Sequence, residues 1–191
     1  NYTGAAITWL KDDLQLIQSP EETMALAGGN PKDRSYFVPA FTGLGAPYWE
    51  SQATGLYTGV TRVTGKKEMV RAVLDAIAYQ INDVTTLMQQ ESGYKLPSLR
   101  VDGGPTKNAY LMQFKRTFSL PVDVPDAAEL SAIGAAYAAG LAVGFYDKDA
   151  LFKDMKGLSY APSMAGERRR ELIAGWQKAI SQTLAVTHQG A

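Results

Sequence analysis

The sequence contains no cysteine and a single histidine, and these two shortages exclude several kinds of site. Without cysteine the chain can form neither disulfide bonds nor thiolate metal centres, so a reducing compartment, the cytoplasm, is the expected location. The one histidine, His188, stands close to the end of the chain, which argues against a serine–histidine triad and against a histidine metal cluster. We therefore expect no metal bound by the protein itself.

A charge imbalance and a long apolar run are also absent. Lysine plus arginine number 19 and aspartate plus glutamate number 19, so the formal net charge is zero. This balance offers no electrostatic reason to expect a nucleic acid or an anionic membrane as partner. The longest uncharged apolar run, residues 132–146, is shorter than the roughly 20 residues that span a bilayer. No basic, apolar leader opens the chain, so we expect no membrane insertion.

The chain does contain alternating helical and extended patterns. Its 191 residues are 46% hydrophobic and 20% charged, which suits one globular domain with a core. Helical spacing of apolar residues predicts helices over 5–17, 66–92, 130–145 and 167–186, and Ser19-Pro20-Glu21-Glu22 predicts another helix start. Short strands are predicted over 36–41, 56–61, 99–102 and 121–124. Alternating strands and helices indicate an α/β fold, and a first helix with no strand before it suggests part of a longer protein.

The stretch VDGGPTKN, residues 101–108, places two glycines between a predicted strand and a predicted helix. Because glycine has no Cβ, a ligand could touch the backbone there, and Asn108 could donate and accept hydrogen bonds. Open α/β sheets bind ligands beyond the carboxyl ends of their strands, where this turn falls. The pattern alone favours a plain turn in which Thr106 or Asp102 caps the helix. The segment is no Walker loop, since the GK[ST] ending is missing.

Two helical segments carry motifs that allow more than one interpretation. The small residues of 134–141 (GAAYAAGL) permit close backbone approach, and close helix–sheet packing is favoured over contact with a nucleotide. Glu68, Asp75 and Asp83 lie along the predicted helix 66–92. An acid–base pair is conceivable, but a solvated helix face with Arg71 nearby is the favoured interpretation.

Two further clusters remain open on the sequence alone. The three arginines of 168–170, flanked by Glu167 and Glu171, favour an exposed helix start, with a phosphate site as the minor alternative. Tyr48 and Trp49, in a glycine-rich loop, would either line a ligand cleft or interface, or cap the core.

Five segments follow one another in a recognisable order, and they span most of residues 4–146. They read GAAITWLKDDLQLI, FVPAFTGLGAPYW, GLYTGVTRVTGKKEMVRAVLDAIAYQ, LRVDGG…N…LMQF and SAIGAAYAAGLAVGFY. The third contains a long signature: Gly55, Tyr57, Gly59 and Val60, then, after a spacer, Glu68, Met69, Ala72, Val73, Leu74 and Asp75. Together the segments resemble the C-terminal half of the FGGY carbohydrate kinases, most closely the members that phosphorylate glycerol.

The resemblance implies an actin-like, ribonuclease-H-like ATPase fold of two similar domains with a cleft between them. Residues 1–160 would form the C-terminal nucleotide-binding domain, incomplete at its N-terminus, and residues 161–191 a helix packed on that domain. Such kinases transfer the γ-phosphoryl group of ATP to a polyol or sugar hydroxyl, with Mg²⁺ carried by the nucleotide. Here the implied product is glycerol 3-phosphate. A kinase of another sugar or polyol, or a non-catalytic actin-like nucleotide-binding module, would share the pattern.

The resemblance also implies which residues meet the nucleotide. Carried over position by position, they are Gly4, Ala6, Thr8, Gly103, Gly104 and Asn108. Thr8 replaces the usual glutamine, so one side-chain contact would be shortened or lost, and residues 105–107 replace small residues. The family's catalytic aspartate and most substrate contacts lie upstream of the matched region. The resemblance therefore names no catalytic residue here, and implies that the chain alone is inactive and that full-length members form dimers or tetramers.

Overall fold

The computed structural model describes residues 2–30, 32–115, 120–126, 130–148, 151, 157–161 and 164–189. In chain order the elements are α1 (Gly4–Asp12), α2 (Glu22–Leu26), β1 (Tyr36–Val38), β2 (Leu56–Thr58), α3 (Lys66–Ser92), β3 (Leu99–Arg100), the 3-10 turn η1 (Gly104–Lys107), α4 (Ala109–Lys115), β4 (Val122–Pro125), α5 (Leu130–Ala142), β5 (Gly157–Tyr160) and α6 (Gly166–Gln189). The side chain of His188 lies outside the described part.

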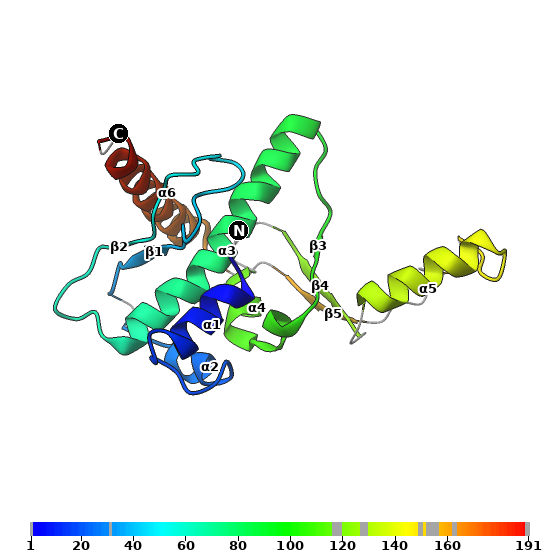
Figure 1. The fold of residues 1–191 in the computed structure, drawn as a ribbon, viewed down its shortest axis with the longest axis horizontal. Coiled ribbons are helices and arrows are strands. Elements are labelled where there is room, and N and C mark those ends of the chain that lie inside the picture. Colours follow the sequence, from blue (N-terminus) through cyan, green and yellow to red (C-terminus); the bar gives the residue numbers. More distant parts are fainter. Residues whose placement is uncertain are drawn as a thin grey trace.

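The long helix α3 runs through the middle of the molecule, and the other elements surround it (Figure 1). Its bounds agree with the sequence prediction, because both ends carry capping signals. The carboxylate of Glu68 accepts the backbone N–H of Gly65 at 2.9 Å, and Gly93 adopts the left-handed φ of 66° that ends a helix. Its buried face joins side chains of α1, α4, β1 and α6 in one hydrophobic core.

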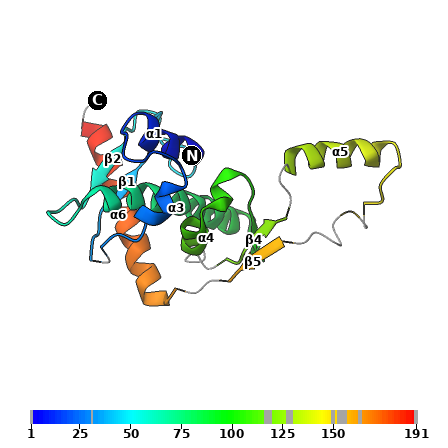
Figure 2. The same cartoon turned by 90° about the horizontal axis from the view of Figure 1, so that it is seen from below.

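On one side of α3, strands β1 and β2 form an antiparallel pair that α6 covers (Figures 1 and 2). Trp176 of α6 stacks on Tyr79 of α3 with ring centroids 5.1 Å apart, and its indole N–H donates to Asp83 at 2.7 Å. Trp176 is almost fully buried. Stacking together with a satisfied indole N–H therefore docks α6 onto α3.

On the other side, β3, β4 and β5 form a three-stranded sheet. β3 pairs parallel to β4, with Leu99 opposite Val122, and β4 pairs antiparallel to β5, with Val122 opposite Tyr160. The hydrogen bond from the N–H of Val101 to the carbonyl of Asp123, at 3.0 Å, continues the parallel pairing just past β3. Strands and helices thus form the mixed α/β arrangement that the sequence predicts.

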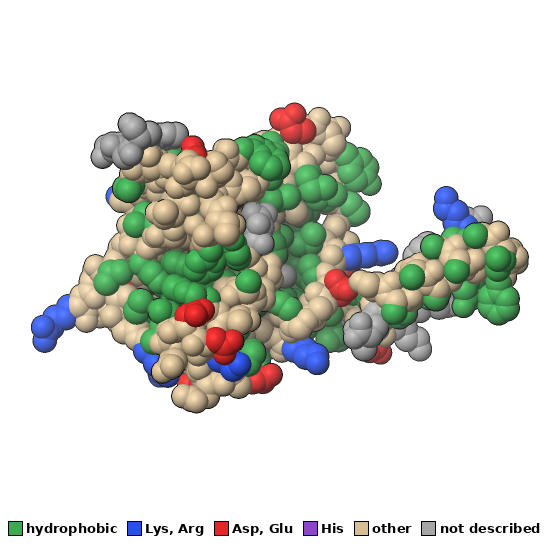
Figure 3. All heavy atoms as spheres, viewed as in Figure 1, with side chains coloured by type: hydrophobic (Ala, Val, Ile, Leu, Met, Phe, Trp, Pro, Cys, Tyr) green, Lys and Arg blue, Asp and Glu red, His purple; other side chains and the backbone are tan. Residues whose placement is uncertain are grey.

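Helix α5 projects away from the rest of the molecule instead of covering the sheet (Figures 1 and 2). Apolar side chains lie exposed along and beyond it (Figure 3), among them Val143 and Phe145. Gly140, the one buried residue of α5, packs against Tyr146 of the turn that follows. The expected close helix–sheet packing of the small residues is therefore wrong for this chain. Small side chains permit close approach, but they do not specify a partner.

Several predicted elements end earlier than their patterns suggest. α1 ends at Asp12 rather than at residue 17. The carboxylates of Asp12 and Asp13 are unfavourable at the negative end of the helix dipole, and Gln15, with a φ of 53°, turns the chain. β1 ends at Val38 because Pro39 has no N–H to pair, and β2 ends before Gly59, whose φ is 71°. Although Ile17 lies beyond the end of α1, its side chain is buried in the core, as the apolar pattern predicts.

Strand β5 has no counterpart among the sequence predictions. Its only signal is the alternation of Leu158 and Tyr160 over four residues, too short to separate from a loop. Pairing with β4, not local preference, makes it a strand. Within the described part of the chain, no helix combines the length and apolar character needed to cross a membrane.

Candidate functional site

A cavity of about 340 Å³ opens between α1, α2 and η1. Four of the residues selected from the sequence line it: Gly4 and Thr8 of α1, Gly104 of η1, and Asn108 directly after η1. Residues about a hundred positions apart thus meet at one wall, close to the carboxyl end of β3. Its volume is within the range of small-molecule pockets, roughly 300–1,000 Å³.

The two adjacent glycines of the VDGG stretch have different tasks. Gly103 adopts φ 87° and ψ 177°, a backbone conformation that essentially only glycine tolerates. Gly104 has an ordinary backbone, and a Cβ placed on it would meet no atom within 4 Å. Gly103 therefore makes the turn, while Gly104 leaves open space beside the backbone on the wall of the cavity.

Asn108 joins two walls of the cavity. Its Oδ1 accepts the N–H of Leu111 at 3.0 Å, which caps α4, and its Nδ2 donates to the hydroxyl of Thr23 in α2 at 2.7 Å. The Thr23 hydroxyl in turn donates to the carbonyl of Pro20 at 2.6 Å. Asn108 is buried and both ends of its amide are engaged, so it holds α2 against α4. The expected caps, Thr106 and Asp102, are replaced by Asn108.

The start of α1 supplies the remaining polar groups of the wall. Thr3, at the N-cap, makes no side-chain hydrogen bond to the helix. The first N–H groups of a helix lack partners within it, and together with the helix dipole they favour an anionic ligand. Gly4 opens this turn at the cavity, and a Cβ there would also meet no atom within 4 Å.

Sequence analysis missed the other half of the cavity. Its further lining residues are Ile7, Pro20, Glu21, Met24, Pro105 and Lys107. A hydrogen bond from Ser19 lowers the pKa of the Glu21 carboxyl. Glu21 and Lys107 give this part of the cavity one acidic and one basic side chain. Pro20 and Glu21 stand in the predicted helix start before α2, and Met24 lies on α2, but nothing in the sequence connects them with a ligand. Packing of α2 against α3 and the hydrogen bond to Asn108 bring them to the cavity.

Two of the selected residues do not line this cavity. Gly103 lies beside it and shapes the turn, and Ala6 is wholly buried in the core beneath α1. The exposed Thr8, in contrast, faces the cavity from α1.

Glu68, Asp75 and Asp83 of α3 do not form the solvated helix face that the sequence suggests. Asp75 accepts the Tyr110 hydroxyl at 2.7 Å. Glu68 is buried and accepts the backbone N–H groups of Asn30 and Gly65. Asp83 accepts the Tyr48 hydroxyl at 2.8 Å and the Trp176 indole, and burial raises the pKa of its carboxyl. The carboxylates of Glu68 and Asp83 hold structural contacts, because the loops and α6 fold over the face that the pattern leaves to solvent.

Tyr48 and Trp49 separate in the structure. Tyr48 is bonded to Asp83 and packs against the core, whereas Trp49 is 77% exposed and adopts a left-handed φ of 53°. Tyr48 therefore caps the core, and Trp49 does not. Among the described residues, no group of three or more histidine, cysteine, aspartate or glutamate side chains is placed to hold a metal ion.

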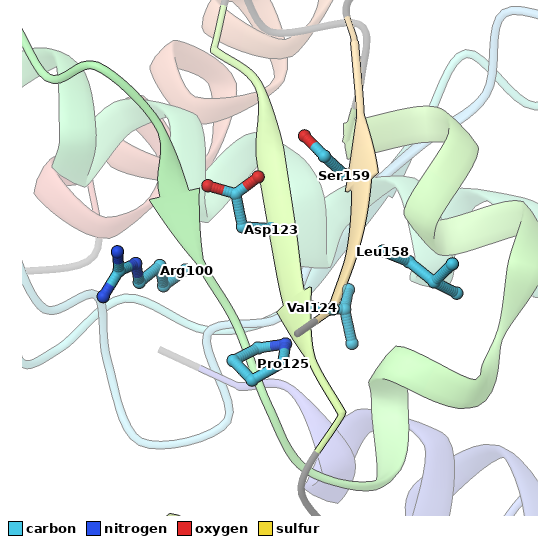
Figure 4. Close-up of a pocket in the computed structure, with 7 residues that line it drawn as sticks. Arg100, Asp123, Val124, Pro125, Leu158 and Ser159 are labelled. Carbon is cyan, nitrogen blue, oxygen red and sulfur yellow. The ribbon is translucent and has the colours of Figure 1, made fainter. Parts of the chain in front are cut away.

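A shallow hollow of about 160 Å³ lies on the three-stranded sheet (Figure 4). Arg100, Asp123 and Ser159 sit opposite one another on β3, β4 and β5 and form a polar row across it. Hydrogen bonds from Ser98 and Ser159 lower the pKa of the Asp123 carboxyl. This row is explained by cross-strand pairing, and no residue selected from the sequence lines the hollow.

Comparison with known proteins provides independent findings on the same chain. The model of the FGGY family of carbohydrate kinases, C-terminal domain, matches residues 1–143. The glycerol kinase of Treponema denticola is 46% identical over 185 residues, which are 95% of this chain and 37% of that protein. The glycerol kinase of Enterococcus casseliflavus is 48% identical over 186 residues, 94% of this chain and 36% of that protein.

Solved structures agree. The Plasmodium falciparum glycerol kinase with ADP superposes with a TM-score of 0.84 at 32% identity, covering 95% of this chain and 37% of that one. The xylulose kinase of Rhodospirillum rubrum, at 23% identity and a TM-score of 0.79, covers 98% of this chain and 39% of that one, and shows the fold alone. This chain thus spans little more than a third of the length of the proteins that it matches.

Proposed function

The chain belongs to the FGGY family of carbohydrate kinases and has their actin-like ATPase fold, and on this premise we propose that it is the nucleotide-binding part of an ATP-dependent glycerol kinase. The reaction would convert ATP and glycerol to ADP and glycerol 3-phosphate in the cytoplasm, where ATP is available. Residues 1–160 would form the nucleotide-binding domain, with residues 161–191 packed on it.

The observation that carries this proposal is the cavity between α1, α2 and η1. Four of the six residues that the family resemblance assigns to the nucleotide line it, although they come from two distant segments of the chain. A similar solved structure is a glycerol kinase with ADP. Our proposal rests on this convergence of an independent geometric feature with the family's nucleotide motif.

The residues of the cavity fit an adenine nucleotide in three ways. The open backbone beside Gly104 leaves room for a flat group, and the apolar side chains of Ile7, Met24 and Pro105 suit a base. The start of α1 at Gly4 offers N–H groups and a positive dipole end to phosphate. Asn108 would act mainly by holding α2 and α4 in place around the ligand.

The nucleotide, with its Mg²⁺, supplies the phosphoryl group that is transferred. The task of this chain would be to bind and orient it, because positioning and charge stabilisation dominate phosphoryl transfer. We assign no catalytic base to the chain. The substrate hydroxyl and the group that deprotonates it would lie in the part of the relatives that this chain does not span.

The proposal is tested by measuring ADP formation from MgATP with glycerol and with a panel of larger polyols and ketoses. We expect glycerol turnover from a polypeptide that joins this chain to the remainder of a glycerol kinase, and none from the 191-residue chain alone.

Preference for a larger substrate would keep the family and replace glycerol. Absence of turnover with every substrate, together with ADP binding, would favour a non-catalytic nucleotide-binding module. Glycerol-dependent ADP formation by the chain alone would show that a catalytic base is present after all.

A further inference from the structure

A second cavity, of about 310 Å³, lies between α3, α4, the first turns of α6 and the loop before β1. It shares no lining residue with the cavity between α1, α2 and η1. Its charged lining residues are Asp33, Arg34, Arg71, Asp75 and Arg168. Three of these five are arginines and two are aspartates, so the lining carries a net charge of +1 when all are ionised and +2 when Asp75 is protonated.

Arg71 is a preorganised cation in this wall. Its guanidinium donates to Asp33 at 2.5 Å, and the Asp33 side chain is fully buried. Asp33 is held in turn by the N–H and hydroxyl of Ser35 and by the hydroxyl of Thr64. These hydrogen bonds fix the guanidinium group in place. Arg71 therefore loses little side-chain conformational entropy when an anion binds it.

Arg34 and Arg168 lie near the mouth of the cavity, where both pair with Glu171. The distances are 2.9 Å from Arg34 and 2.5 Å from Arg168, and the three side chains are between 35% and 49% exposed. Exposed ion pairs of this kind contribute little to stability, because solvent screens the charges. A bound anion could therefore recruit these guanidinium groups at little cost.

Asp75 is the group inside the cavity that opposes an anion. It accepts the Tyr110 hydroxyl at 2.7 Å, and its other oxygen lies 3.7 Å from Nε of Arg71. The charged and titratable groups that face it are Arg71 and Tyr79 on α3, Tyr110 on α4, Arg168 on α6 and Tyr36 on β1. Burial outweighs these contacts and raises the pKa of Asp75 to about 7. Near neutral pH the carboxyl can thus take up a proton.

We propose that this cavity is a second ligand site, separate from the nucleotide cavity, that binds a small oxyanion on Arg71 and Arg168. The ligand would be inorganic phosphate or sulfate, or the anionic end of a small metabolite, since the volume exceeds that of the anion. Binding would favour protonated Asp75, because a second negative charge beside the ligand is unfavourable in a buried setting.

The proposal is tested by calorimetric titration of the 191-residue chain with sodium sulfate at constant ionic strength, with chloride as the balancing anion, at pH 6 and pH 8. Sulfate is chosen because it does not titrate in this range. The wild-type chain should bind sulfate about tenfold more tightly at pH 6, since the protonated fraction of a carboxyl with a pKa near 7 changes by that factor. The Asp75→Asn variant should bind with the same affinity at both pH values.

Arg168→Gln should weaken sulfate binding by about tenfold or more, because a charge-assisted hydrogen bond is lost. Arg170→Gln removes the same charge from an exposed position of α6 outside the cavity and should leave binding unchanged. Circular dichroism of both variants checks that α6 remains folded. Titration with O-phosphoserine in parallel distinguishes an inorganic anion from an anionic metabolite as the ligand. Tighter binding than sulfate indicates a metabolite, and equal or weaker binding indicates an inorganic anion.

Four results would overturn the proposal. They are no sulfate binding at either pH, equal weakening by Arg168→Gln and Arg170→Gln, the same pH dependence in wild type and Asp75→Asn, and displacement of sulfate by saturating ADP. The last result would place the anion in the nucleotide cavity. The first three results do not bear on whether ADP binds in the candidate nucleotide cavity, and the fourth presupposes that ADP binds, so failure of this proposal leaves the proposed kinase function standing.

Discussion

At the scale of single residues, two neighbouring glycines of one motif have different surroundings and backbone angles. Gly103 is required by its backbone angles, whereas Gly104 is required only if something occupies the space beside it. The sequence cannot separate these tasks, because both positions are written with the same letter. The structure separates them through the φ of one residue and the open surroundings of the other.

Replacement of Gly104 therefore tests the candidate nucleotide cavity without disturbing the fold. We expect Gly104→Val to weaken ADP binding roughly tenfold or more, since the side chain would enter the space of the ligand and overpacking costs about 1–3 kcal/mol. The free energy of unfolding should change little, because a Cβ there meets no protein atom within 4 Å. Calorimetric titration with ADP and urea unfolding measure the two effects.

Two glycines serve as matched controls for that variant. Gly134→Val on α5 also adds a side chain in open space, but away from the cavity, and should leave ADP binding unchanged. Gly103→Ala should destabilise the chain by about 1–3 kcal/mol through backbone strain. Equal ADP affinity of wild type and Gly104→Val would show that the nucleotide lies elsewhere.

At the scale of elements, one hydrogen bond ties α2 to the start of α4 beside the cavity. The amide of Asn108 both caps α4 and reaches the hydroxyl of Thr23 on α2. The short helix α2 also packs against α3, and Glu22 pairs with Lys66 of α3. A helix of five residues would not be stable without such contacts. The Asn108 amide therefore adds a link from α4 to the wall that carries Glu21 and Met24.

Substitution of Asn108 should separate its two tasks. Asn108→Ala removes the cap and the link, and we expect a loss of about 1–3 kcal/mol in unfolding free energy with weaker ADP binding. Asn108→Ser keeps a capping hydroxyl but is too short to reach Thr23, so it should recover part of the stability and little of the affinity. Urea unfolding followed by circular dichroism, and ADP titration, give the two readings. If both variants bind ADP like the wild type, α2 does not depend on this bond.

At the scale of the whole molecule, buried carboxyls make stability depend on pH in opposite directions. Hydrogen bonds lower the pKa values of Glu68 and Asp33, so both favour the folded state when ionised. Burial instead raises the pKa of Asp75 to about 7, so its ionised form disfavours the folded state. The folded chain holds more protons at Asp75 than the unfolded chain between about pH 4 and pH 7.

The contribution of Asp75 to the free energy of unfolding should therefore be fully present below about pH 4 and lost as the pH rises through about 7. We expect Asp75→Asn, which keeps an acceptor for the Tyr110 hydroxyl, to remove this loss, at most about 1.4 kcal/mol per pH unit. Urea unfolding of both proteins at pH 5, 6 and 7 gives their free energies of unfolding. The difference between the variant and the wild type should grow with pH. Parallel curves for the two proteins would mean that Asp75 ionises normally in the folded chain.

Sequence reasoning located most elements but not all of their ends or partners. The span of α3 was predictable because glycine and glutamate signals at its ends coincide with a long apolar periodicity. The end of α1 and the strand β5 were not, since a turn at Gln15 and pairing with β4 decide them. The direction of α5 could not be predicted either, because small residues allow close packing but do not specify the surface against which the helix packs.

Ordered motifs and local periodicity were enough to identify the family, the α/β character and four of the residues that line the candidate nucleotide cavity. The folded arrangement was needed to see which glycine has open space beside it, that Asn108 links α2 to α4, and that Asp75 lies buried beside Arg71. These facts depend on contacts between segments far apart in the chain. A local pattern specifies which groups a segment carries, but only packing specifies what those groups meet.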